Sequence, residues 1–142
     1  MTMPTDEQIE ALAAALDAFA RRFKLADAGS VRPLTEIDKQ LLQYVNRHPD
    51  CGPTDVARFL AVATTTISSA TDRLAKRGLL ERHRPEGDRR AVALRLSKAG
   101  KTYVANQQQA YLKMFRTMLE RLSPDERDNF VAMMAKIAYY ED

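Results

Sequence analysis

The chain has 142 residues, of which 45% are hydrophobic and 29% are charged, with 22 lysines and arginines against 19 aspartates and glutamates. This length and composition predict one globular domain spanning residues 1–142. No apolar run reaches membrane-spanning length and no charged-then-apolar leader opens the chain, so we expect a cytoplasmic protein with no membrane partner. The single cysteine, Cys51, excludes an internal disulfide framework.

The first predicted element is a long helix over residues 5–25. Thr5 is followed three residues later by Gln8, which is the spacing of a capping box. Apolar residues then recur at helical intervals up to the end of this segment. Residues 26–33 have the composition of a loop.

Two shorter helices are predicted next. Thr35 is expected to cap the first of them, which should stop before Pro49 because proline disfavours helical backbone in the residue that precedes it. Thr54 is expected to cap the second, which runs from Asp55 to Leu60.

Residues 64–71 are unusually rich in hydroxyl side chains. Ile67, Ala70 and Leu74 place an apolar stripe on one side of a predicted helix. The residues of the opposite side are Thr65, Ser68, Ser69 and Asp72. Short polar side chains let a helix lie deep in the DNA major groove and hydrogen-bond to base edges. Gly78 is expected to end the helix in a left-handed conformation.

A basic β-hairpin is predicted after this helix. Strands at Leu79–Arg84 and Arg90–Leu96 flank a turn at residues 85–88. In the second strand apolar residues occupy every other position, which is the period of a half-buried ribbon. A helix followed by a basic hairpin is the order of elements in a winged helix-turn-helix.

Basic residues are concentrated in residues 72–101, which hold ten lysines and arginines against four acidic residues. The rest of the chain holds twelve basic and fifteen acidic residues. A basic patch on an otherwise acidic protein is expected of a surface that binds phosphate groups. A solvated charged surface is the alternative, and the neighbouring hydroxyl-rich helix favours phosphate binding.

Five segments between residues 55 and 100 carry a family resemblance. They are DVARFL, the hydroxyl-rich helix, RLAKRGLLER, the wing motif Asp88-Arg89-Arg90, and LRLSKAG. Together they resemble the DNA-binding core of the MarR family of bacterial transcriptional regulators. The resemblance implies a mainly α-helical fold with a small β-hairpin wing. It places a winged helix-turn-helix core at residues 34–100 and dimerisation helices at residues 5–25 and 98–140.

The two C-terminal helices are predicted to begin at serine caps. Ser97 should start a helix that runs to about Arg121 with a coiled-coil-like apolar seam, and Ser123 should start the last one. Together with residues 5–25 they carry more apolar surface than a winged core can cover. An intramolecular helical cap would explain this surface, but we favour a homodimer because symmetric dimers read two DNA half-sites. The resemblance implies the same.

The predicted function is a sequence-specific double-stranded DNA-binding regulator, a repressor that binds a pseudo-palindromic operator. The predicted DNA-binding residues are Thr64, Thr65, Thr66, Ser68, Ser69, Arg73, Arg84, Asp88, Arg89 and Arg90. The resemblance assigns Arg90 to the minor groove and Asp88 to holding the wing turn. The alternative is a winged-helix module that docks an acidic protein partner.

The resemblance also implies a pocket between the terminal dimer helices and the winged core, for a small aromatic or phenolic effector that releases the DNA. The candidate lining residues are Phe19, Phe23, Tyr44, Tyr111, Phe115 and Met118. The same residues at helical spacing would also fit plain core packing.

No enzymatic or cofactor motif is found, so we expect neither catalysis nor a cofactor. His48 and His83 are the only histidines, too few for a metal site, and His83 is expected at the surface or facing DNA. Cys51 has no neighbouring cysteine to resolve a sulfenic acid, so we expect a small apolar loop residue rather than a redox sensor.

Overall fold

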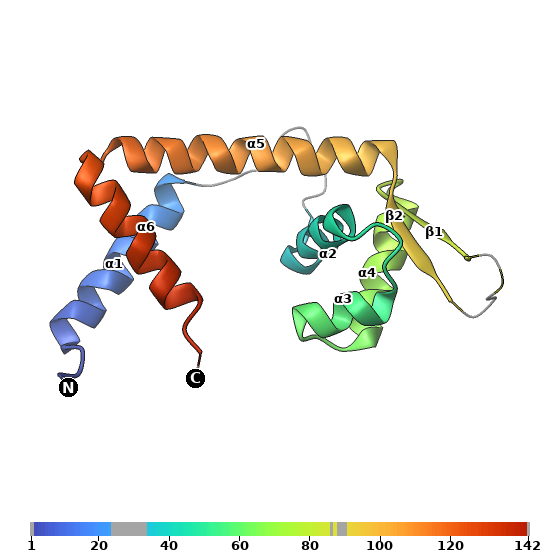
Figure 1. Ribbon diagram of the computed structural model, residues 1–142, viewed down its shortest axis with the longest axis horizontal. Helices are drawn as coiled ribbons and strands as arrows, with labels where there is room; N and C mark the ends of the chain where they lie inside the picture. Colours follow the sequence, from blue (N-terminus) through green and yellow to red (C-terminus); the bar gives the residue numbers. More distant parts are fainter. Residues whose placement is uncertain (1, 24–33, 86, 88–90, 142) are drawn as a thin grey trace. The chain divides into compact units, whose positions relative to one another are not determined.

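The computed structural model describes residues 2–23, 34–85, 87 and 91–141. These residues form six helices and one antiparallel hairpin (Figure 1). Their bounds are α1 (Asp6–Arg22), α2 (Glu36–Arg47), α3 (Pro53–Leu60), α4 (Thr64–Lys76), β1 (Leu80–His83), β2 (Ala93–Leu96), α5 (Lys98–Glu120) and α6 (Pro124–Ala138). The predicted fold, mainly α-helical with a small β-hairpin, is confirmed.

The chain divides into two compact units. The winged-helix unit is Asp27–Gln109, and the terminal unit combines Met1–Ala26 with Ala110–Asp142. The predicted helix end at Leu25 and the predicted loop at residues 26–33 lie outside the described residues, and α1 ends at Arg22.

Three of the predicted helix starts are confirmed as complete capping boxes. The side-chain oxygens of Thr5, Thr35 and Ser123 each accept a hydrogen bond from the backbone N–H three residues later, at 3.1, 3.1 and 3.3 Å. In each case the side chain of that later residue accepts from the cap's own N–H. These short-range bonds satisfy donors that a helix start leaves unpaired, so local sequence sets the three boundaries.

The predicted start of α3 is wrong. Gly52, not Thr54, is the N-cap, and Pro53 is the first helical residue. Two features of the sequence explain the shift. Proline has the backbone angle of a first helical residue and lacks the N–H that would be unpaired there. The Asp55 carboxylate, in the first turn of the helix, accepts a hydrogen bond from the Gly52 N–H at 3.0 Å and so caps the helix start.

The core of the winged-helix unit lies where α2, α3, α4 and the hairpin meet (Figure 1). Its fully buried side chains are Leu41, Leu42, Val45, Val56, Ile67, Leu74 and Leu94. They come from α2, α3, α4 and β2, so these four elements are packed on the same apolar cluster. The predicted apolar stripe of α4 is confirmed, since Ile67, Ala70 and Leu74 are all 0% exposed.

The end of α4 and the hairpin follow the prediction with shorter strands. Gly78 has a φ of 74°, and the Leu79 N–H donates to the Leu74 carbonyl at 3.0 Å, which is a Schellman ending. β1 and β2 pair antiparallel, with Leu80 opposite Leu96. Each strand has four residues, so the predicted strands extended too far at Leu79, Arg84, Ala91 and Val92, while Arg90 lies outside the described residues.

The start of α5 is packed tightly against the end of α4. The Ser97 hydroxyl donates to the Gly78 carbonyl and accepts from the Gly100 N–H at 3.0 Å, which confirms the predicted cap. The Ser97 N–H donates to the Leu79 carbonyl at 3.1 Å. A Cβ on Gly100 would lie 2.0 Å from that same Leu79 oxygen. Only glycine therefore fits at position 100.

The terminal unit contains α1, the end of α5, and α6. The Arg127 guanidinium donates to the Leu119 carbonyl at 2.7 Å, joining the first turn of α6 to the end of α5. Neither α1 nor α6 has a buried residue along its described length. Apolar residues of this unit that are at least 55% exposed include Ile9, Leu12, Leu16, Val131, Met133 and Ile137.

We expect Gly100→Ala to destabilise the protein by about 3 kcal/mol, because the clash is with backbone and cannot be relieved by a rotamer change. Helix propensity alone predicts the opposite sign, since alanine is favoured over glycine by about 1 kcal/mol inside a helix. Chemical denaturation measures the difference. Gly52→Ala is the control, because its Cβ would meet no atom closer than 3.6 Å. Stabilisation by Gly100→Ala would contradict the close packing.

Candidate nucleic-acid interface

The first turns of α4 carry the predicted hydroxyl surface. The five hydroxyl residues proposed to contact DNA are all exposed, namely Thr64, Thr65, Thr66, Ser68 and Ser69. They surround Ile67, which is fully buried and fixes this part of the helix on the core. The structure therefore brings these five predicted residues together on one rigid, exposed helical surface of short polar groups.

Thr71 belongs to the same hydroxyl-rich segment but lies in the interior. It is 3% exposed, and its hydroxyl donates to the Ile67 carbonyl at 2.7 Å. A buried hydroxyl without a partner would be costly, and this bond within the helix removes that cost. Thr71 thus packs against the core, whereas its neighbours in the sequence face outward.

Arg73 is held by α2. Its Nη2 donates to Asp38 Oδ1 at 2.9 Å, and the Asp38 side chain is only 6% exposed. The same carboxylate also accepts from the Thr35 N–H at the start of α2, at 3.4 Å. A buried carboxylate needs such partners. Arg73, predicted to bind DNA, therefore ties α4 to α2, a connection that sequence spacing did not indicate.

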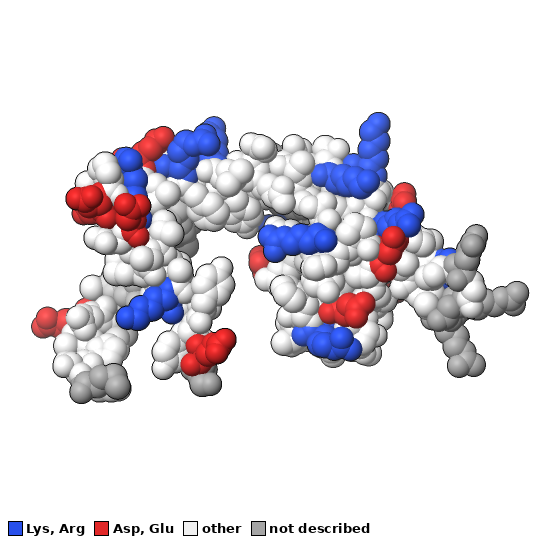
Figure 2. Space-filling model, in the orientation of Figure 1, with Lys and Arg blue, Asp and Glu red and all other residues white. Residues whose placement is uncertain are grey.

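A second ion pair ties α4 to the hairpin. Arg82 Nη1 in β1 lies 2.5 Å from Asp72 Oδ1 in α4, and both side chains are about half exposed. The sequence places Arg82 in a basic patch, but in the structure its charge is paired with that of Asp72. On the face of the winged-helix unit seen in Figure 2, acidic and basic residues alternate.

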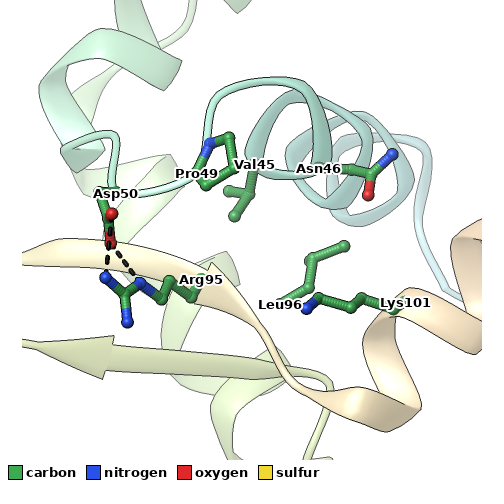
Figure 3. A pocket seen from close by; sticks show the side chains of 7 residues that line it. All are labelled: Val45, Asn46, Pro49, Asp50, Arg95, Leu96 and Lys101. Carbon is green, nitrogen blue, oxygen red and sulfur yellow. Dashed lines mark hydrogen bonds and ion pairs between the residues drawn. The ribbon is translucent and has the colours of Figure 1, made fainter.

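A third cluster joins the hairpin to the turn between α2 and α3. Arg95 of β2 binds the Asp50 carboxylate with both Nε and Nη2, the latter at 3.0 Å (Figure 3). His83 Nε2 of β1 lies 2.9 Å from the same carboxylate. The hydrogen bond from Arg95 is the main reason that the pKa of Asp50 is lowered below its ordinary value. No local sequence pattern points to Asp50, because its partners lie 33 and 45 residues away.

The predicted wing residues are only partly described. Arg84 is exposed just beyond β1. Asp88, Arg89 and Arg90 lie outside the described residues, so their predicted roles stay predictions.

The predicted effector residues separate into three groups. Phe19, Phe23 and Met118 line one cavity of about 250 Å³ in the terminal unit. The other lining residues are Leu119, Arg121, Leu122 and Phe130. Tyr111 and Phe115 stack on each other with ring centroids 5.9 Å apart. Tyr44 lies in the winged-helix unit, with its ring 4.5 Å from that of His48 and 5.0 Å from that of Phe59.

Cys51 lies on the buried side of the turn before α3. It is 9% exposed, and burial raises the pKa of its thiol to about 11.

Across the described part of the chain, no three His, Cys, Asp or Glu side chains are grouped as metal ligands would be. Nor does any described helix combine the length and apolar character needed to cross a membrane.

The arrangement of α2, α3, α4 and the hairpin defines a winged helix-turn-helix protein. A sequence model described as the MarR family matches residues 33–91. The HTH-type transcriptional regulator YwhA of Bacillus subtilis is 27% identical over 125 residues, which cover 87% of this chain and 90% of that protein.

Solved structures share the fold. Streptococcus pneumoniae FabT in complex with DNA matches with a TM-score of 0.78 at 22% identity, over 91% of each chain. The PcaV transcriptional regulator of Streptomyces coelicolor, in complex with its natural ligand, matches with a TM-score of 0.62 at 20% identity, over 97% of each chain. Residues 33–91 thus match the MarR family model, and over most of its length the chain is similar in sequence or fold to transcriptional regulators.

We expect the Cys51 thiol of the folded protein to react at pH 8 about 100-fold more slowly with a disulfide reagent than in the unfolded chain. The thiolate is the reactive form, and a pKa of about 11 against the ordinary 9.0 leaves correspondingly little of it. Absorbance of the released reagent, with and without denaturant, measures both rates. Equal rates would place Cys51 at the surface and reopen an oxidant-sensing role.

Proposed function

We propose that this chain is a sequence-specific, double-stranded DNA-binding repressor that reads a pseudo-palindromic operator as a homodimer. The observation that carries the proposal is the exposed hydroxyl surface at the start of α4, from Thr64 to Ser69. It stands on a helix that is buried on its other side and tied to α2 and β1 by ion pairs. A rigid helix with short polar side chains suits the major groove. The FabT structure with DNA has the same fold.

The apolar surfaces of α1 and α6 support the homodimer. Leu12 is 61% exposed and Ile137 is 74% exposed, and similar residues accompany both along their helices. Contiguous exposed apolar surface is typical of an interface rather than of a monomer. A second copy of the chain would cover the same surface on both partners, as a two-fold dimer requires, and would place two α4 helices for two half-sites.

The cavity in the terminal unit supports release by a small aromatic or phenolic acid. Phe19, Phe23 and Phe130 supply aromatic walls, and Arg121 is the single charged residue of the lining. Aromatic walls suit a ring, and a guanidinium suits a carboxylate. The neighbour PcaV, with its natural ligand bound, is a regulator of the same fold. Tyr111, Phe115 and Tyr44 are not among the residues that line this cavity.

The alternative function is a winged-helix module that docks an acidic protein. Three ion pairs weigh against it. Arg73, Arg82 and Arg95 would be among the basic residues that bind an acidic partner, but each is already paired with an aspartate of this chain. The hydroxyl surface of α4 also has no evident use in such docking. Neither function involves catalysis or a cofactor.

Gel shift with DNA from around the protein's own gene tests the function. We expect preference for a pseudo-palindrome and an affinity that falls steeply as salt rises.

Ser69→Ala should reduce discrimination between the operator and a mutated operator by about 1–3 kcal/mol, because a base contact is lost. Thr102→Ala is the control, since its exposed hydroxyl is bonded within α5 to the Lys98 carbonyl. Equal losses on operator and random DNA would mean that Ser69 contacts phosphate only.

Sedimentation at micromolar concentration tests the homodimer. We expect a species of twice the 16.0 kDa chain mass in the absence of DNA. Ile137→Glu should yield monomers, because a charge in an apolar interface is costly, whereas Asn129→Glu adds the same charge at an exposed polar position of α6. A wild-type monomer at this concentration would refute the dimer, and dissociation by both variants would show that the effect is not specific to the apolar surface.

A further inference from the structure

Asp50 connects three segments of the winged-helix unit with one carboxylate. It lies in the turn between α2 and α3, and its oxygens bind Arg95 of β2 and approach His83 of β1. Each strand of the hairpin is therefore joined to the same side chain. The Asp72 carboxylate, by comparison, is paired with Arg82 of β1.

The backbone of the turn is held to β2 as well. The Asp50 N–H donates to the Leu94 carbonyl at 2.9 Å, and the Leu94 N–H donates to the Cys51 carbonyl at 2.9 Å. Asp50 itself has a φ of 69°, in the left-handed region that few residues other than glycine, asparagine and aspartate adopt. This backbone conformation directs the carboxylate at the hairpin.

The surroundings of the ion pair indicate that it contributes more to geometry than to stability. Asp50 and Arg95 side chains are 47% and 54% exposed, and such pairs add little to the free energy of unfolding. The pair lies at one side of an open cavity of about 380 Å³, also lined by Pro49 and Lys101 (Figure 3). A bidentate contact between a guanidinium and a carboxylate nevertheless fixes direction. The pair can thus orient the hairpin while leaving overall stability almost unchanged.

We propose that Asp50 is a positioning residue that holds the hairpin at a fixed place relative to α4, so that both reach their DNA contacts together. The inference rests on the proposed DNA-binding function and deepens it. Asp50 acts through Arg95 and His83 and needs no contact with DNA itself. Its removal should reduce operator recognition by the hairpin and leave the major-groove contacts of α4 in place.

Simple electrostatics predicts the opposite result. Removing a carboxylate from a DNA-binding unit makes that unit more positive, so affinity for any DNA should rise. Glu81 provides a matched comparison, because it is exposed and lies opposite Arg95 in the hairpin register. Asp50→Asn and Glu81→Gln remove the same charge near the same guanidinium. Only the first removes the bidentate contact.

The test measures operator and random-DNA affinity for both variants, with hydroxyl-radical footprinting of the operator. Asparagine also accepts a left-handed backbone, so Asp50→Asn keeps the turn. We expect its operator affinity to fall about tenfold, which is the size of effect expected when one base contact is lost. Its affinity for random DNA should not fall. Protection should disappear at the flanks of the operator and persist at its centre. The melting temperature should change by less than about 2 °C. Glu81→Gln should retain or increase operator affinity.

The double variant Asp50→Asn with Arg95→Gln should lose no more than Asp50→Asn alone, because the two residues act as one unit. Asp50→Gly, which accepts a φ of 69° without strain, is the second variant if Asp50→Asn folds poorly. Operator affinity that stays the same or rises in the Asp50 variants, with intact flank protection, would overturn the inference while the proposed function stands. A wild-type protein with no operator preference would overturn both.

Discussion

The contact between the Leu79 carbonyl and the backbone of Gly100 is the constraint on which the arrangement of the winged-helix unit depends. The carbonyl occupies the space where any other residue at position 100 would carry its Cβ. It also accepts from the Ser97 N–H, while the Ser97 hydroxyl bonds both Gly78 and Gly100. The end of α4, the start of β1 and the start of α5 therefore meet at one point, where the Ser97 hydroxyl bridges α4 and α5. The direction in which α4 is presented is set here by backbone packing.

Three aspartate–arginine pairs then hold α4 and the hairpin in place from other sides. Arg73 reaches α2, Arg82 reaches α4, and Arg95 reaches the turn before α3. The pairing changes what the basic composition of this region means. A count of charges treats every arginine as available to bind phosphate. These three arginines are instead paired with aspartates of the same chain, and the pairs hold elements of the unit together. The proposed DNA-binding surface therefore depends more on the uncharged hydroxyl groups of α4 than the net charge suggests.

Local features of the fold could be predicted from the sequence, and long-range ones could not. The caps at Thr35 and Ser123, the end of α4 at Gly78, and the hydroxyl surface of α4 each depend on residues within one or two helical turns. The start of α3 was missed because Thr54 looked like a cap, although the proline before it and the aspartate after it act together. The ion pairs of Asp38 and Asp50 join residues 35 and 45 positions apart, which no periodic pattern records. Thr71 was likewise not distinguishable from its exposed neighbours, because its bond to the Ile67 carbonyl becomes necessary only once the core has formed.

The order in which the two units can assemble follows from their connectivity. The winged-helix unit is one continuous stretch, whereas the terminal unit needs α1 from the beginning of the chain and α6 from its end. Phe23 and Phe130 line one cavity, but more than a hundred residues are synthesised between them. At typical translation rates that interval is on the order of ten seconds. During synthesis the apolar surface of α1 therefore has no partner from its own chain, while the winged-helix unit already has all the residues it needs to fold.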